Sequence, residues 1–233
     1  MKKILLIACM VIAGMSVSAQ ISTLLEKGKS GIGIKGTYEK SNGFYAFGGR
    51  LGGSVAGKLD IEFCYQYHFW DQEKNNLLTD NATSSYYEGR LTYWLIRKEI
   101  IPAIEVNFGA LAGFDYGPFT NYKYAGEPDG SVTTYDYYMD GQVGLAASIN
   151  FNVGKSWFLQ PTFSVTCEFG SQRESTQYEE RTWSDNGITS KIGLTLMKRF
   201  TNGSAIYLDA DTFSETYGTY PFYNFSLGYV LPF

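Results

Sequence analysis

Histidine and cysteine are scarce in this chain, and each shortage excludes a class of site. The 233 residues include one His and three Cys. A single imidazole excludes a metal centre built from several histidines, and three thiols exclude both a disulfide scaffold and a four-cysteine zinc site. Positive charge is not in excess either, because 19 Lys and Arg stand against 23 Asp and Glu. We therefore expect no nucleic-acid partner.

Long apolar runs are also rare. The longest spans residues 4–14, which is too short to cross a bilayer as a helix. Lys2 and Lys3 precede it, and the small residues Val17-Ser18-Ala19 follow it. This pattern is typical of a secretory signal peptide, so we predict that residues 1–19 are removed and that the mature chain begins at Gln20. No other stretch is apolar over the roughly 18 residues that a membrane-spanning helix needs.

Aromatic residues and glycine are abundant instead, with 19 Tyr, 16 Phe and 26 Gly. Much of the chain beyond residue 30 alternates apolar and polar residues with a period of two. From Leu59 to Phe69, every odd position is apolar or aromatic, while the even positions include Asp60, Glu62 and His68. Side chains of a strand alternate between its two faces, so this pattern predicts strands with one apolar and one polar face. Ten segments show it, with eight as the alternative count: 32–39, 45–55, 59–69, 87–95, 104–116, 135–153, 157–169, 188–199, 206–211 and 223–233.

The connections between these segments alternate in length. Short ones are expected at 56–58, 97–101, 152–156 and 201–203, and long polar ones at 70–82, 117–133, 170–187 and 214–221. The remaining connection, residues 40–43, contains Asn42-Gly43, which favours a tight hairpin turn. Short turns at one end and long loops at the other are typical of an up-and-down transmembrane β-barrel. We predict an all-β fold, a closed antiparallel barrel with both chain ends on the short-turn side.

Charge is confined to one face of the predicted strands. The polar face carries about eleven acidic residues, which are Glu39, Asp60, Glu62, Glu88, Glu105, Asp115, Asp136, Asp140, Glu168, Asp209 and Asp211. The same face carries Lys35, Arg50, Arg90, Lys191 and Arg199, while the apolar face is nearly free of charge. A Lys or Arg that faces lipid at the bilayer midplane costs about 2–4 kcal/mol, so we predict apolar side chains outside and an acid-rich lumen inside. The alternative is a secreted lipocalin-like barrel or a sandwich.

With its signal peptide, ten alternating strands and a last segment that runs Tyr223, Phe225, Leu227, Tyr229, Leu231, Phe233, the chain resembles the small outer-membrane β-barrel proteins of Gram-negative bacteria. The resemblance implies an outer-membrane location and contact with outer-membrane lipids. It also implies recognition by the barrel-assembly machinery through the strand that ends at Phe233. Residues 31–233 would form the barrel. Residues 20–30 would be a short periplasmic lead, or would tuck into the barrel.

Motifs that could mark a catalytic, cofactor or metal site lack the context they need, and we predict no such site. Residues 31–36 match G-x-G-x-x-G, but the alternation continues through them and no helix follows. Asp209-Ala210-Asp211 resembles the start of a calcium loop, yet Tyr220 stands where its Glu belongs. We expect these two carboxylates to pair with a lumen Lys or Arg. Cys64 and Cys167 fall on opposite faces of non-neighbouring strands, which predicts two free thiols.

Three functions remain open from the sequence. The first is a non-enzymatic structural barrel or a narrow, porin-like channel that favours cations. The second is a surface protein that binds an extracellular ligand through loop residues, for which the candidates are Trp70, Tyr122, Tyr124, Tyr178 and Trp183. The third and least favoured is an enzyme that uses His68 near the outer rim, with an acid partner among Asp71, Asp115 and Asp136.

Overall fold

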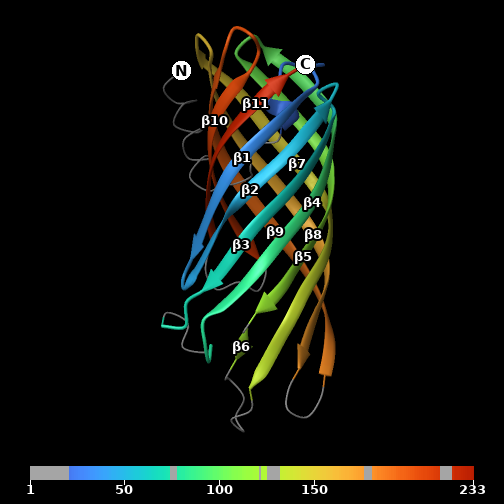
Figure 1. Ribbon diagram of the computed structural model, residues 1–233. Helices are drawn as coiled ribbons and strands as arrows, with labels where there is room; N and C mark the ends of the chain where they lie inside the picture. The colour runs from blue at the N-terminus through green and yellow to red at the C-terminus, as the bar shows by residue number, and fades with distance from the viewer. Residues whose placement is uncertain (1–20, 74–77, 121, 125–131, 176–179, 216–221) are drawn as a thin grey trace, which may run out of the picture.

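The computed structural model describes residues 21–73, 78–120, 122–124, 132–175, 180–215 and 222–233, which form a closed barrel of ten long antiparallel strands (Figure 1). The signal peptide predicted at residues 1–19 lies outside these ranges. The barrel strands are β1 (Gly31–Ser41), β2 (Phe44–Val55), β3 (Leu59–Trp70), β4 (Ala82–Ile101), β5 (Ile104–Thr120), β7 (Thr133–Gly154), β8 (Trp157–Ser175), β9 (Glu180–Arg199), β10 (Ala205–Glu215) and β11 (Phe222–Pro232). The predicted ten-stranded fold is confirmed, and the count of eight is wrong.

Neighbours in sequence pair with one another around the whole barrel. The sheet closes because β1 pairs with β11 as well as with β2, and because β5 pairs directly with β7. A further two-residue strand, β6 (Lys123–Tyr124), pairs only with the outer end of β7. Closure gives every barrel strand a hydrogen-bonded neighbour on each side. A sheet in hydrocarbon requires this, because no water is there to satisfy its backbone groups.

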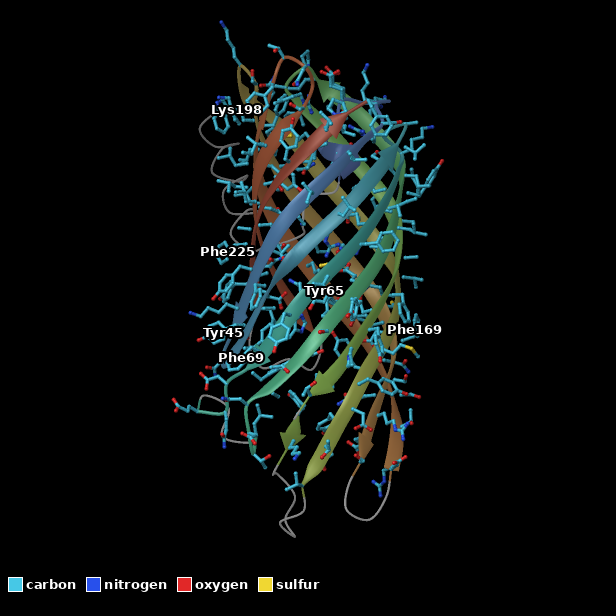
Figure 2. The ribbon with its side chains drawn as sticks, in the orientation of Figure 1. Tyr45, Tyr65, Phe69, Phe169, Lys198 and Phe225 are labelled. Atoms are coloured by element: carbon cyan, nitrogen blue, oxygen red, sulfur yellow. The ribbon has the colours of Figure 1, made fainter. Side chains whose placement is uncertain are left out.

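The two faces of the strands divide as predicted. Strand β1 alternates buried and exposed residues along almost its entire length. On β3, Phe63 is 65% exposed while its neighbour Glu62 is 3% exposed. Tyr65 and Phe225 project from the outer wall in Figure 2. An apolar exterior around a charged interior is unfavourable in water and favourable in a bilayer.

Several strands are longer than the alternation predicted. The segment 170–187 was expected to be a loop, but β8 and β9 remain paired out to Ser175 and Glu180. The segment 117–133 is also partly strand, since β5 reaches Thr120. In both segments hydropathy stops alternating before backbone pairing ends: residues 170–187 are polar on both faces, and residues 117–120 read Gly-Pro-Phe-Thr. Arg173 stabilises this outer extension through Glu180, at 2.6 Å.

The short turns lie at the opposite end from these extensions. Ala56 and Gly57 adopt positive φ angles of 51° and 59° in a tight turn that the Lys58 N–H closes by donating to the Val55 carbonyl at 3.0 Å. The connection expected at 97–101 is shorter than predicted, because β4 continues to Ile101 and only Pro102-Ala103 remain outside the strands. The described chain begins and ends at this side, where the Phe233 backbone N–H donates to the Ser30 carbonyl at 3.0 Å (Figure 1).

Residues that precede the first strand fold back onto the barrel. They include the four-residue helix α2 (Ile21–Leu24), followed by a turn that leads into β1. Among the described residues, no helix has the length and apolarity to span a membrane.

Candidate functional site

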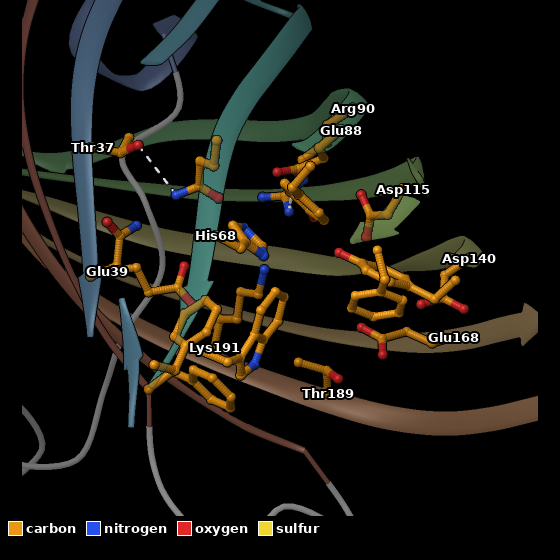
Figure 3. Close-up of a pocket in the computed structure, with 18 of the residues that line it drawn as sticks. Thr37, Glu39, His68, Glu88, Arg90, Asp115, Asp140, Glu168, Thr189 and Lys191 are labelled. Atoms are coloured by element: carbon orange, nitrogen blue, oxygen red, sulfur yellow. Dashed lines mark hydrogen bonds and ion pairs between the residues drawn. The ribbon is translucent and has the colours of Figure 1, made fainter. Parts of the chain in front are cut away.

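A cavity of about 380 Å³ opens at the long-loop end of the barrel (Figure 3). Its floor is charged, with six carboxylates facing three cationic side chains, which are Glu39, Glu88, Asp115, Asp140, Glu168 and Asp211 against Arg50, Arg90 and Lys191. These residues come from eight different strands, so only the closed barrel brings them together. Its volume is within the range of small-molecule binding sites, about 300–1,000 Å³.

The wall of the cavity nearest the long loops is a cluster of aromatic rings. Phe44 contacts both Trp70 and Phe222, with ring centroids 5.2 and 5.5 Å apart. Trp70 continues the cluster to Tyr122 at 5.1 Å and to Phe119 at 5.5 Å. On the far side, Tyr138 contacts Phe119 at 5.5 Å and stacks on Tyr86 at 6.0 Å. We call Phe44, Trp70, Tyr86, Phe119, Tyr122, Tyr138 and Phe222 the aromatic rim.

Charged and polar pairs fill the lumen from the cavity floor toward the periplasmic end. Glu88 accepts hydrogen bonds from Arg50 at 2.5 Å and forms an ion pair with Arg90 at 2.6 Å. Arg50 also contacts Glu62 at 3.4 Å. Lys35 pairs with Asp209 at 3.4 Å, and further pairs are Trp94 with Asp60 and Asn107 with Ser148. Side chains thus cross the barrel interior, as expected for a barrel of roughly this strand number.

The residues that precede β1 lie inside the periplasmic end of the barrel. Leu24 and Leu25 are fully buried in an apolar cluster with Met197, Ala205, Tyr207 and Val230. Lumen side chains bind the backbone of this segment: Arg199 donates to the Leu24 carbonyl at 2.8 Å, and Arg97 to the Leu25 carbonyl at 3.2 Å. Asn150 donates to the Thr23 carbonyl at 3.0 Å. We call Thr23–Leu25 the plug, and it lies inside the barrel end.

His68 faces inward near the outer end of its strand, as predicted, and it lies among rings. It stacks on Tyr86 with centroids 4.9 Å apart and meets Phe44 edge-on at 5.1 Å. Its Nε2 atom is buried and has no hydrogen-bond partner among the described residues. The three acids considered as its partners have other contacts that the structure shows. Gln142 donates to Asp115, Arg173 pairs with Asp136, and the backbone N–H of Glu73 donates to Asp71.

Of the two lumen carboxylates expected to pair with a Lys or Arg, Asp209 does so, with Lys35 at 3.4 Å. Asp211 instead accepts a hydrogen bond from the Asn224 side chain at 3.0 Å. The segment 31–36 is the start of β1, so its glycines belong to a strand. Cys64 is buried inside, Cys167 is exposed outside, and both are free thiols.

Two of the five loop aromatics predicted for ligand binding line the cavity. Trp70 and Tyr122 do belong to the cavity wall, and they contact each other there. Tyr124 lies on β6 and Trp183 on β9, while Tyr178 lies outside the described residues. Sequence reasoning missed the other five rings of the aromatic rim. Phe44, Tyr86, Phe119 and Phe222 lie outside the ten segments in which alternation was recognised, and Tyr138 lies on the polar face of its segment. An aromatic residue in register with the polar set, such as Tyr138 beside Asp136 and Asp140, was the available signal.

The closed sheet, the apolar exterior and the charged lumen define a class, the bacterial outer-membrane β-barrel, and place this protein in the outer membrane. No protein-family model and no curated protein sequence matches the chain. Among solved structures it is similar to the translocator domain of autotransporter NalP from Neisseria meningitidis, with 10% identity, a TM-score of 0.51, and 91% of this chain and 92% of that one covered.

The beta domain of the Bordetella autotransporter BrkA is also similar, with 14% identity, a TM-score of 0.50, and 88% of this chain and 100% of that one covered. The outer membrane protease OmpT from Escherichia coli shares 9% identity at a TM-score of 0.47, over 88% of this chain and 96% of that one. At such identities the likeness concerns the fold alone.

Proposed function

We propose that this protein is a non-enzymatic outer-membrane barrel that recognises a ligand at its extracellular mouth and passes little or no solute. One observation carries the proposal: the cavity is open at the long-loop end, and beneath it the lumen is filled by ion pairs and then by the plug. An aromatic wall with a few convergent polar groups is typical of a binding site.

A narrow, weakly cation-selective channel is the second candidate function. The excess of carboxylates in the lumen supports it, because rings of acidic side chains favour cations. The paired side chains weigh against it, since Arg50 and Arg90 both hold Glu88 in the lumen. Any conducting path would have to displace these ion pairs and the plug.

Catalysis by His68 is the least supported function. A histidine base is normally oriented by a third group, usually a carboxylate. The rings of Phe44, Trp70 and Tyr86 surround His68 instead. We therefore propose a contribution of His68 to the cavity wall, with no part in bond cleavage.

The proposed partners at the other surfaces follow from the exposed residues. Outer-membrane lipids would cover the apolar exterior, and the barrel-assembly machinery would bind the last strand. The ring of Phe233 supports the second interaction, because this residue is 78% exposed and extends past the end of β11.

Planar-bilayer recording tests the sealed lumen. We expect the mature protein to show no stable conductance steps, and we expect the same after deletion of residues 21–27, because the ion pairs of Arg50 remain. Combining that deletion with Arg50→Ala and Glu88→Ala removes both barriers and should give small cation-selective steps. Large steps from the unmodified protein, or from the plug deletion alone, would contradict the proposal.

A further inference from the structure

The cavity floor places carboxylates of consecutive strands side by side. Asp115 on β5 is the direct cross-strand partner of Asp140 on β7, and Glu168 on β8 pairs with Gln142, two residues further along β7. Figure 3 shows Asp115, Asp140 and Glu168 grouped on one side of the cavity. Like charges directly opposite each other destabilise a sheet. A cation bound here would relieve this repulsion.

Two buried polar atoms that line the same cavity lack a partner. Asp115 is 9% exposed, and its Oδ2 accepts from Gln142 at 2.7 Å, while its Oδ1 has no hydrogen-bond partner in the described part of the chain. His68 is 8% exposed, and its Nε2 is likewise unpartnered. A buried polar atom without a hydrogen bond costs free energy, so a bound molecule that supplies the missing donor or acceptor would be stabilised here. An N–H group on a bound ligand would supply one.

The aromatic rim indicates which chemical groups the ligand carries besides an N–H donor. Ring faces attract cations within about 6 Å and also pack against apolar groups. A bare metal ion would make no use of the aromatic rings, and among the described residues no three His, Cys, Asp or Glu side chains are placed so that they could hold a metal ion. The cavity volume of about 380 Å³ suits a small organic molecule.

We propose that the cavity binds a small amphipathic organic cation, with its ammonium group against Asp115 and Asp140 and its apolar part against the aromatic rim. The inference rests on the proposed function, since it names the ligand class for the same cavity. The acid excess of the floor, six carboxylates against three cationic side chains, adds long-range attraction for positive ligands.

Calorimetric titration with three probes of one shape tests the ligand charge. The probes are 2-phenylethylamine, 2-phenylethanol and phenylacetate, which are cationic, neutral and anionic. The mature protein should be held in a non-ionic detergent, because phosphocholine headgroups carry a quaternary ammonium group that could compete for the same cavity. We expect saturable one-to-one binding of the amine, with the alcohol at least about tenfold weaker and the acid not binding.

Two isosteric variants place the binding in this cavity. Asp115→Asn and Asp140→Asn should each weaken amine binding by about tenfold or more, since each removes one charge from the floor. Glu99→Gln removes the same charge from an exposed position at the periplasmic end and should leave binding unchanged. Heat-modifiable migration on a denaturing gel checks that each variant is folded.

The outcomes separate the two proposals. If the alcohol or the acid binds as tightly as the amine or more tightly, the ligand is not a cation. That result would still agree with ligand recognition at the extracellular mouth. Absence of amine binding at millimolar concentration, or unchanged binding in both Asp variants, also overturns the cation site. Large conductance steps together with the expected amine binding would overturn the sealed barrel and retain the ligand class.

Discussion

At the scale of single residues, one side-chain type can stabilise the barrel on its inner face and destabilise it on its outer face. Leu91 is 48% exposed near the middle of β4, where lipid covers it, while Arg90 beside it is buried and paired with Glu88. Arginine is therefore tolerated at one position and excluded from the next, because only the lumen offers a carboxylate.

Leu91→Arg tests the lipid-facing assignment. We expect it to lower the free energy of unfolding by about 2–4 kcal/mol in lipid vesicles, because it places a guanidinium near the bilayer midplane. Ile100→Arg, at an exposed position near the periplasmic end of the same strand, should cost about 0–1 kcal/mol. Denaturant titration in vesicles measures both, and equal costs would contradict the predicted depth of Leu91.

Glu88 tests the ion pairs that fill the lumen. Glu88→Gln should lower the free energy of unfolding by about 3–5 kcal/mol, because it leaves Arg50 and Arg90 buried with weaker partners. Asp136→Asn is the control, since Asp136 and Arg173 are about 40% exposed and such pairs contribute about 0–1 kcal/mol. A small loss for Glu88→Gln would mean that water enters this part of the lumen.

At the scale of elements, the two ends of the barrel differ in what they hold. The long-loop end carries strands that extend past the apolar region, and these support the aromatic rim. The periplasmic end has tight turns, and its lumen is filled by the plug, whose backbone carbonyls accept hydrogen bonds from Arg97 and Arg199. Recognition at one end and closure at the other thus arise from separate segments.

The last strand offers an element-scale prediction about assembly. Phe233 is largely exposed, so its deletion should change the free energy of unfolding little, by less than about 1 kcal/mol. The same deletion should strongly reduce the amount of folded barrel in cells if the assembly machinery reads this residue. Comparing heat-modifiable protein from cells with protein refolded in detergent separates the two effects. Equal yields of both proteins in cells would argue against the signal.

At the scale of the whole molecule, one closed sheet separates a lipid-facing from a lumen-facing set of side chains. Spin labels at positions 143 and 105 test this division, after replacement of Cys64 and Cys167 by serine. We expect the label at Val143, which is 52% exposed, to collide with oxygen dissolved in lipid. The label at Glu105, which faces Arg97 inside, should be shielded from lipid. The reverse result would invert the barrel and contradict the assignment of its faces.

The amino-acid sequence by itself determined the all-β fold, the inner and outer faces of the strands, and the inward position of His68 near the rim, and it left the strand count at ten or eight. These features depend on a period of two, which is local and survives in any short window. Only the tertiary structure decided the strand extensions beyond residues 116 and 169, the partners of Arg50 and Glu88, the gathering of Phe44, Phe119 and Phe222 around one cavity, and the position of Leu24 inside the barrel. Each of these depends on register and closure, which bring together residues far apart in the chain, and no local pattern encodes such contacts.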